Sequence, residues 1–302
     1  MKDFLLKVVL PVVGVVMAGM TVVECIAETM PKDNYYKRRV EYLTQNADSL
    51  QLLVLGPSST MMSVIPHLLD KKGYNASESS QPARMDYCLL KRFIDKMPKL
   101  EYVIFNFNAS TLYSRQIVPG GDGEIQLYNY SVHYGADYYF MYKYYVMGGY
   151  KAIMSAFKGG DNDEKHMEND GFITYQPHKW TEAEKEEVHK KWTRHSDIND
   201  EGRFVDSIVN LCESRNIKLI LLAPPITADY VDSRKPELDE LRQVSEKYRG
   251  RKNIYLVDYL RPSFIVDSLD MRDWAHCNPN GARKVTLALN DSIRKWEGRC
   301  SN

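Results

Sequence analysis

The chain has 302 residues, and its 40 basic and 40 acidic side chains give a formal net charge of zero. That balance argues against a nucleic-acid-binding protein, which usually carries a basic excess. A hydrophobic fraction of 44% with 26% charged residues excludes wholesale disorder, and the modest glycine and proline counts exclude a collagen-like or low-complexity chain. The length suits one large domain or two small ones.

The amino-terminal segment is strongly apolar. Residues 8–23 carry no charge in 16 positions, and they approach the length of a spanning helix. Three interpretations compete: a retained signal anchor over residues 1–30, a signal peptide cleaved near Ala27, and a buried core helix. We expect the anchor, with residues 31–302 forming a domain outside the cytoplasm. Basic residues flank the segment on both sides, so the positive-inside rule does not decide its orientation.

Short apolar runs then alternate with amphipathic stretches. The runs predict buried strands over residues 51–56, 102–107, 217–224 and 253–258. Residues 33–49 are polar and helical in character, which predicts a stalk or a first helix. The later stretches predict helices over residues 61–73 with a break at Pro66, 81–97, 203–214, 235–248 and 280–296. Such alternation is typical of a parallel sheet with helices on both faces, which is a three-layer α/β/α sandwich.

Residues 112–200 interrupt this alternation, and we interpret them as an insertion. A glycine-rich loop is expected over residues 117–124 and a charged helix over 181–194. Between them, residues 127–150 contain nine tyrosines. These rings either form the core of a helical cap or lie exposed, where they would stack on sugars or sit at a membrane interface.

A serine follows the first predicted strand. The strand ends in Gly56-Pro57-Ser58, and an open parallel sheet places its reactive groups at this carboxyl edge. A hydroxyl in a strand-to-helix turn is also a common helix cap. Ser58 alone therefore leaves both interpretations open.

A second motif lies before the last predicted helix. Asp273 precedes His276 by three residues, so its carboxylate can hold the Nδ1–H of the imidazole and leave Nε2 as a base. Such a base could activate a serine hydroxyl. The alternative is an exposed loop histidine. Asn278 or Asn280 would cap the helix that follows.

The cysteines and the other histidines indicate no metal site. The five cysteines are too far apart for a CxxC pair, and we expect buried free thiols. The other six histidines are scattered, and a site from His189 and His195 is not expected. We predict no metal and no organic cofactor.

Two sequence blocks carry a resemblance to a known family. LVLGPSST at the first strand and DWAHCNPNGA before the last helix resemble the first and last blocks of the SGNH, or GDSL-like, hydrolases. The chain is most similar to membrane-anchored SGNH-like proteins of bacterial envelopes, among them relatives of DltD and of the alginate acetylation proteins. The similarity covers residues 50–110 and 203–296. It implies a flavodoxin-like fold with five parallel strands, so the segment Tyr74–Ala76 becomes the remaining strand.

The resemblance also implies roles for individual residues. Ser58 would be the nucleophile and its N–H an oxyanion donor, with His276 as base and Asp273 as its orienting partner. The glycine of the second block is missing, and the Ser80 N–H would substitute for it. The third block lacks its glycine too, and Asn108 would be the side-chain donor. Ser59 is the fallback nucleophile.

Together these features predict an extracytoplasmic serine esterase or O-acyltransferase. The resemblance implies acylated cell-surface polysaccharide as substrate and a membrane-bound acyltransferase as partner, with no nucleic acid. The alternative is a catalytically inactive envelope protein on an SGNH scaffold, which would bind glycan or the acyltransferase without turnover.

Overall fold

The computed structural model describes residues 4–29, 34–108, 111, 122–135, 148–149, 151, 154, 165–175 and 202–300. The chain divides into two compact units. The first comprises residues 1–40 and 117–163, and the second comprises residues 41–116 and 164–302. The predicted helix over 181–194 lies outside the described residues.

The second unit is built on a five-stranded parallel sheet in the order β2-β1-β3-β6-β7. This is the flavodoxin-like order, and it confirms the predicted α/β class. The strands are β1 (Leu52–Leu55), β2 (Gly73–Asn75), β3 (Tyr102–Asn106), β6 (Lys218–Ala223) and β7 (Ile254–Asp258).

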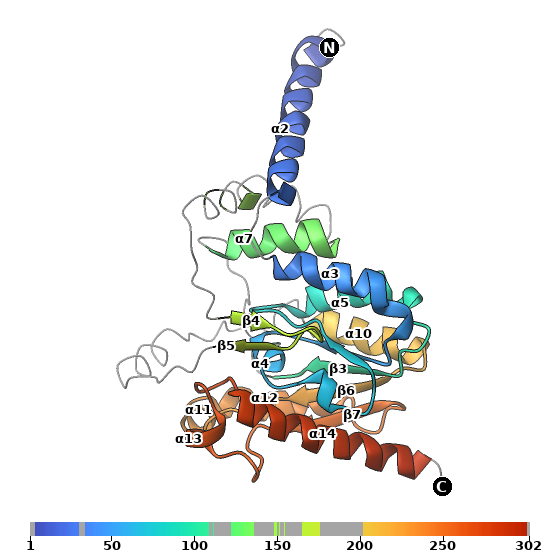
Figure 1. Cartoon of the computed structure of the whole chain (residues 1–302), viewed down its shortest axis with the longest axis vertical. Helices are drawn as coiled ribbons and strands as arrows, with labels where there is room; N and C mark the ends of the chain where they lie inside the picture. The colour runs from blue at the N-terminus through green and yellow to red at the C-terminus, as the bar shows by residue number, and fades with distance from the viewer. Residues whose placement is uncertain are drawn as a thin grey trace. The chain divides into compact units, whose positions relative to one another are not determined.

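Helices cover both faces of this sheet, as Figure 1 shows. Helices α5 (Ala83–Phe93) and α10 (Gly202–Ser214) pack together on one face, and α14 (Pro279–Cys300) covers the other. The remaining helices of this unit are α4 (Ser58–Met61), α11 (Ala228–Ser233), α12 (Lys235–Glu246) and α13 (Asp267–Asp270). Helix α3 (Tyr35–Asn46) begins in the first unit and ends in the second.

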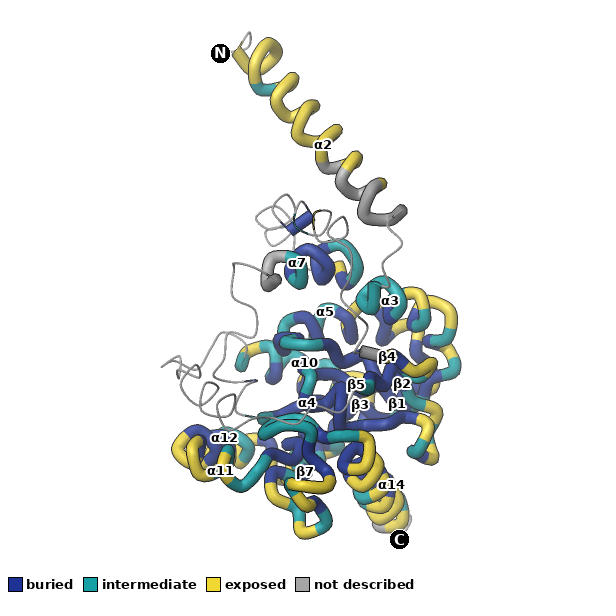
Figure 2. The backbone as a smooth tube through the Cα atoms, turned by 60° about the vertical axis from the view of Figure 1, so that its left-hand side comes forward, coloured by how far each residue is buried: buried dark blue, intermediate teal, exposed yellow. Residues whose placement is uncertain are grey.

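The core explains why the strands are apolar throughout. Every residue of β1 and β3 is buried, and these two strands are dark blue in Figure 2. Alternate residues such as Val54 and Ile104 pack with Leu289 and Ile293 of α14. Because the intervening residues face the helices of the other layer, neither face of these strands tolerates a polar pattern.

One predicted helix is largely absent. Residues 61–73 do not continue as a helix beyond α4, and Pro66–Leu68 form a single 3-10 turn instead. Asn75 Nδ2 donates to the carbonyl of Val64 at 2.8 Å, which satisfies a backbone acceptor outside any helix. Helix α4 has already ended at Met61, and Pro66 disfavours a helical conformation at Ile65, which is extended, so no helix resumes before the 3-10 turn.

The insertion contributes a short antiparallel hairpin to the second unit, β4 (Lys165–Met167) and β5 (Ile173–Tyr175). Its turn contacts the end of β2, where the N–H of Asn75 donates to the carbonyl of Asp170 at 2.8 Å. Gly171 has a φ of +83°, and a Cβ there would lie 2.1 Å from the carbonyl oxygen of Asn75. Only glycine allows this close approach.

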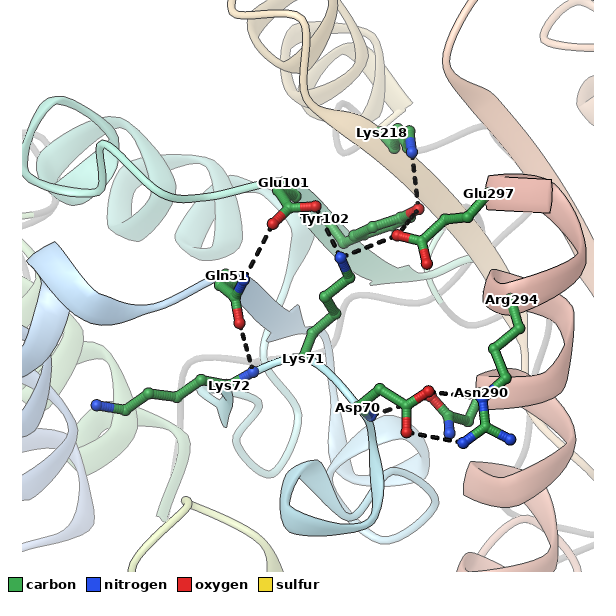
Figure 3. A network of polar contacts seen from close by, with 10 residues as sticks. All are labelled: Gln51, Asp70, Lys71, Lys72, Glu101, Tyr102, Lys218, Asn290, Arg294 and Glu297. Carbon is green, nitrogen blue, oxygen red and sulfur yellow. Dashed lines mark hydrogen bonds and ion pairs between the residues drawn. The ribbon is translucent and has the colours of Figure 1, made fainter. Parts of the chain in front are cut away.

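A polar network lies at the opposite edge of the sheet, where the strands begin (Figure 3). Lys71 pairs with Glu101 and Glu297, each at 2.9 Å. The Lys218 ammonium donates to the Tyr102 hydroxyl, which in turn donates to Glu297. This network ties the last turns of α14 to the strand starts.

The first unit holds helix α2 (Leu10–Thr29), preceded by a π-helical turn over Leu5–Val9, and helix α7 (Asp122–Asn129), followed by another over Tyr130–Tyr134. Helix α7 starts inside the region predicted as a glycine-rich loop. Within the described part of the chain, no helix meets the length and apolarity needed to cross a membrane.

Three of the nine tyrosines of the insertion have described side chains, and all three are buried. Tyr128, Tyr130 and Tyr134 are at most 2% exposed. Tyr36 contacts the rings of Tyr130 and Tyr134. For these three, the core interpretation is confirmed, and the other six lie outside the described side chains.

Candidate active site

Ser58 lies at the carboxyl end of β1, where a glycine permits the turn. Gly56 has a φ of +135°, and a Cβ there would lie 2.4 Å from the Cβ of Asn106. The chain can therefore leave the strand in this direction only because Gly56 has no side chain. Pro57 is extended, and Ser58 opens the short helix α4 with a half-buried side chain.

A tight loop before α14 presents His276. Met271 and Cys277 form an antiparallel bridge, and the carbonyl of His276 accepts the N–H of Arg272 at 2.8 Å. Within the loop, the N–H of Ala275 donates to Asp273 Oδ1 at 2.9 Å. This loop therefore holds the imidazole and the carboxylate as one unit.

The cap of α14 fixes the far side of the same loop. Asn278 Oδ1 accepts the N–H groups of Asn280 and Gly281 at 2.9 and 3.1 Å, so Asn278 is the residue that caps the helix. A Cβ on Gly281 would lie 2.2 Å from the carbonyl oxygen of Asp270. The glycine thus allows the first turn of α14 to begin directly against the end of α13.

The structure brings Ser58 to the pair Asp273 and His276, which lies more than two hundred residues further along the chain. His276 Nε2 lies 2.8 Å from Ser58 Oγ, and Nδ1 lies 2.8 Å from both carboxylate oxygens of Asp273. With the Nδ1 proton directed at the carboxylate, Nε2 can accept the serine proton. The His276 side chain is 23% exposed and that of Asp273 is 5% exposed, so the pair is shielded while the imidazole is still reachable.

The electrostatics favour an ionised carboxylate. Burial alone would raise the pKa of Asp273, but the adjacent imidazole and the N–H of Ala275 lower it below its ordinary value. Burial raises the pKa of the neighbouring Cys277 thiol to about 12, which keeps that thiol neutral.

Ser59, the fallback nucleophile, has different partners. Its hydroxyl donates to Asn106 Oδ1 at 3.1 Å and accepts from Asn108 Nδ2 at 3.3 Å. The buried Asn106 also accepts the hydroxyl of Thr60 at 2.8 Å. These contacts hold Ser59 in the wall of the site, and the imidazole pairs with Ser58.

Of the predicted oxyanion donors, Asn108 and Ser80 are both half-buried. The amide of Asn108 is oriented by Thr111, whose N–H and hydroxyl contact Asn108 Oδ1 at 3.1 and 3.3 Å. Its Nδ2 is directed at Ser59, the residue beside Ser58.

Ser80 has a φ of +54°, a left-handed conformation that costs a side-chain-bearing residue about 1–2 kcal/mol. A glycine would adopt this conformation freely.

Sequence reasoning missed two residues behind the site. Asp86 is 1% exposed, and its Oδ1 accepts the N–H of Gly56 at 2.9 Å. Asn106 is fully buried beneath Ser59 and Thr60. A signal existed for Asp86, because it precedes Leu89, Leu90 and Phe93 at three, four and seven positions and so shares the apolar stripe of α5.

The cysteines and the remaining histidines form no further centre in the described ranges. No cluster of three or more potential metal ligands occurs among the described residues. Cys212 and Cys277 are buried free thiols, whereas Cys88 is partly exposed and Cys25 is exposed. His67 contacts Asp170 at 2.7 Å, a pairing that only the tertiary structure creates.

A distant similarity to known proteins exists at the level of structure. No known protein family and no curated protein matched the sequence. Among solved structures, the chain is similar to an acetyl xylan esterase from the rumen bacterium Butyrivibrio proteoclasticus, with a TM-score of 0.35 and 11% sequence identity. The alignment covers 83% of this chain and 65% of that one, so this chain spans about two thirds of the esterase's length. Similarity at this level does not assign an activity to this chain.

Proposed function

We propose that the protein is a serine esterase or O-acyltransferase of the SGNH type. The observation that carries this proposal is the chain of contacts from Ser58 Oγ through the imidazole of His276 to the carboxylate of Asp273, with 2.8 Å at each step. A serine hydroxyl becomes a competent nucleophile when such a base takes its proton. The depressed pKa of Asp273 supports a carboxylate that stabilises the imidazolium formed in the reaction.

The reaction proceeds in two half-reactions. Ser58 Oγ attacks the ester carbonyl while its proton moves to His276 Nε2, and the leaving alcohol departs with that proton. The acyl group is then bound to Ser58. Water or a sugar hydroxyl attacks the acyl-enzyme, gives its proton to His276 and releases Ser58, which recovers the proton. Water as acceptor makes the enzyme an esterase, and a sugar hydroxyl makes it a transferase.

The oxyanion of each tetrahedral intermediate is held by the N–H groups of Ser58 and Ser80 and by the amide of Asn108. Two observations support this part of the proposal. Ser80 has the left-handed backbone that a glycine would take in the family, and Asn108 Nδ2 lies beside Ser59 at the end of β3. Donors aimed at the developing charge are often the largest single contribution to catalysis.

The substrate proposed is acylated cell-surface polysaccharide, with a membrane-bound acyltransferase as partner. The resemblance of the two sequence blocks to envelope SGNH proteins supports this choice. The apolar amino-terminal segment attaches the protein to the membrane and leaves the catalytic unit on the periplasmic or extracellular side. Its support is the exposure of eleven large apolar side chains between Phe4 and Val22.

A fluorophosphonate probe on the full-length chain in mild detergent tests the catalytic proposal. We expect covalent label on Ser58, located by mass spectrometry, and its loss in Ser58→Ala and His276→Ala. Ser207→Ala, which changes a partly exposed serine of α10, is the control and should label like the parent chain. An unlabelled but folded chain would refute the activated serine and favour the inactive scaffold.

Two further assays resolve the remaining choices. Hydrolysis of p-nitrophenyl acetate with and without a sugar acceptor separates an esterase from a transferase. Carbonate extraction of membranes tests the attachment. A soluble chain that begins near residue 28 would show instead that the segment is a cleaved signal peptide.

A further inference from the structure

A buried carboxylate of α5 joins the two loops that carry the proposed backbone oxyanion donors. Asp86 Oδ1 accepts the N–H of Gly56 at 2.9 Å and the side-chain Nε2 of Gln81 at 2.5 Å. Asp86 and Gln81 are each 1% exposed. One oxygen atom thus contacts both the turn after β1 and the loop after β2.

Backbone hydrogen bonds close these contacts into a ring. The N–H of Glu78 donates to the carbonyl of Gly56 at 3.1 Å, and the N–H of Gln81 donates to the carbonyl of Glu78 at 3.1 Å. We call Gly56, Glu78, Gln81 and Asp86 the Asp86 ring. A further bond from Gln81 Nε2 to the carbonyl of Ala76, at 3.3 Å, secures the same loop to the end of β2.

The Asp86 ring includes or flanks two residues with a positive φ, Gly56 and Ser80. Gly56 is held at a φ of +135°, two residues before Ser58. Ser80 is held at a φ of +54°, between Glu78 and Gln81. Residues in such unfavourable backbone conformations persist only where the surrounding structure enforces them.

A carboxylate suits residue 86 because it must accept two buried hydrogen bonds. Hydrogen bonds to a carboxylate are stronger than those between neutral groups, and they are strongest where water is excluded. An apolar side chain at residue 86 would leave the N–H of Gly56 and the amide of Gln81 buried without this acceptor.

We propose that Asp86 is a positioning residue that holds the N–H groups of Ser58 and Ser80 in register for the oxyanion. This inference rests on the proposed function, because it assigns a role within the same active site. Asp86 does not touch the reacting atoms. It acts through the backbone of the two loops.

The test uses the full-length chain with Asp86→Ala and Asp86→Asn. Asparagine keeps the shape of the side chain and one acceptor oxygen, so Asp86→Asn should show a smaller effect than Asp86→Ala. It also keeps the test possible if the alanine variant fails to fold. The control is Asp206→Asn, which changes a carboxylate in the first half of α10 that contacts Tyr248 and Lys247 and is no part of the Asp86 ring.

The first readout is amide hydrogen exchange, which needs no catalytic activity. We expect exchange in peptides spanning residues 55–59 and 77–82 to accelerate about 10- to 100-fold in Asp86→Ala, less in Asp86→Asn, and not at all in the control. Unchanged exchange in both loops would overturn the proposal, whatever the reactivity of the serine.

The second readout is the rate constant for fluorophosphonate labelling per folded molecule. We expect a fall of about 10²-fold in Asp86→Ala with an unchanged midpoint of its pH dependence, because the base His276 is intact. Labelling of Asp86→Ala at the parent rate would overturn the positioning role. If the parent chain is not labelled at all, the proposed function fails, and the exchange measurement still decides whether the ring holds the loops.

Discussion

The turn that leads into Ser58 depends on a glycine, and Gly56→Ala provides a quantitative test of that dependence. The new Cβ would lie 2.4 Å from the Cβ of Asn106 and 2.8 Å from Thr60 Oγ1, both in the wall of the site. The φ of +135° adds backbone strain for any residue with a side chain.

The two costs can be separated within the same chain. Gly250 also has a positive φ, +76°, but a Cβ there would meet nothing within 4 Å. Gly250→Ala therefore measures backbone strain alone, about 1–2 kcal/mol. The contact with Asn106 joins two fixed atoms near the backbone, so Gly56→Ala should lose a further ~1–3 kcal/mol.

Thermal unfolding of the full-length chain checks this difference. At roughly 2–4 °C per kcal/mol, Gly250→Ala should lower Tm by a few degrees and Gly56→Ala by about 5–15 °C. Labelling of Ser58 should fall in Gly56→Ala only. Equal Tm values for the two variants would refute the claim that a Cβ at residue 56 clashes with Asn106.

Three other predictions follow from single contacts. Asp273→Asn should lower the labelling rate of Ser58 by about 10³- to 10⁴-fold, because the amide cannot hold the imidazole in the required tautomer, and a loss under tenfold would argue against its role. Ser80→Gly should keep the oxyanion N–H while relieving the left-handed strain, raising Tm by about 1–4 °C, whereas Ser80→Ala should not raise it. Hydrogen bonding to Lys71 lowers the pKa of Glu297 (Figure 3), so the stabilisation from this carboxylate is present above its ordinary pKa of 4.5 and is lost as pH falls through the lower folded value. Glu297→Gln should therefore flatten the fall of Tm between about pH 5 and 3, and parallel Tm curves for the two chains would contradict this assignment.

Local sequence pattern was sufficient for most of the sheet. The runs at residues 51–56 and 102–107 predicted β1 and β3 to within a residue or two, because strands buried on both faces have no polar alternation. The pairing of Asp273 with His276 was also readable, since a spacing of three residues is a local property. The predicted helix over residues 61–73 was wrong, because apolar residues that fill a core also occur in irregular segments.

The tertiary structure decided the contacts that join distant segments. No spacing rule places Asp86 against Gly56, or Asn106 beneath Ser59, because these pairs depend on how strands and helices pack in three dimensions. The choice between Ser58 and Ser59 was open for the same reason. The hydroxyl of Ser58 contacts the imidazole of His276, whereas the hydroxyl of the next residue, Ser59, contacts the amide of Asn108. Only the packed sheet determines which of the two serines faces His276.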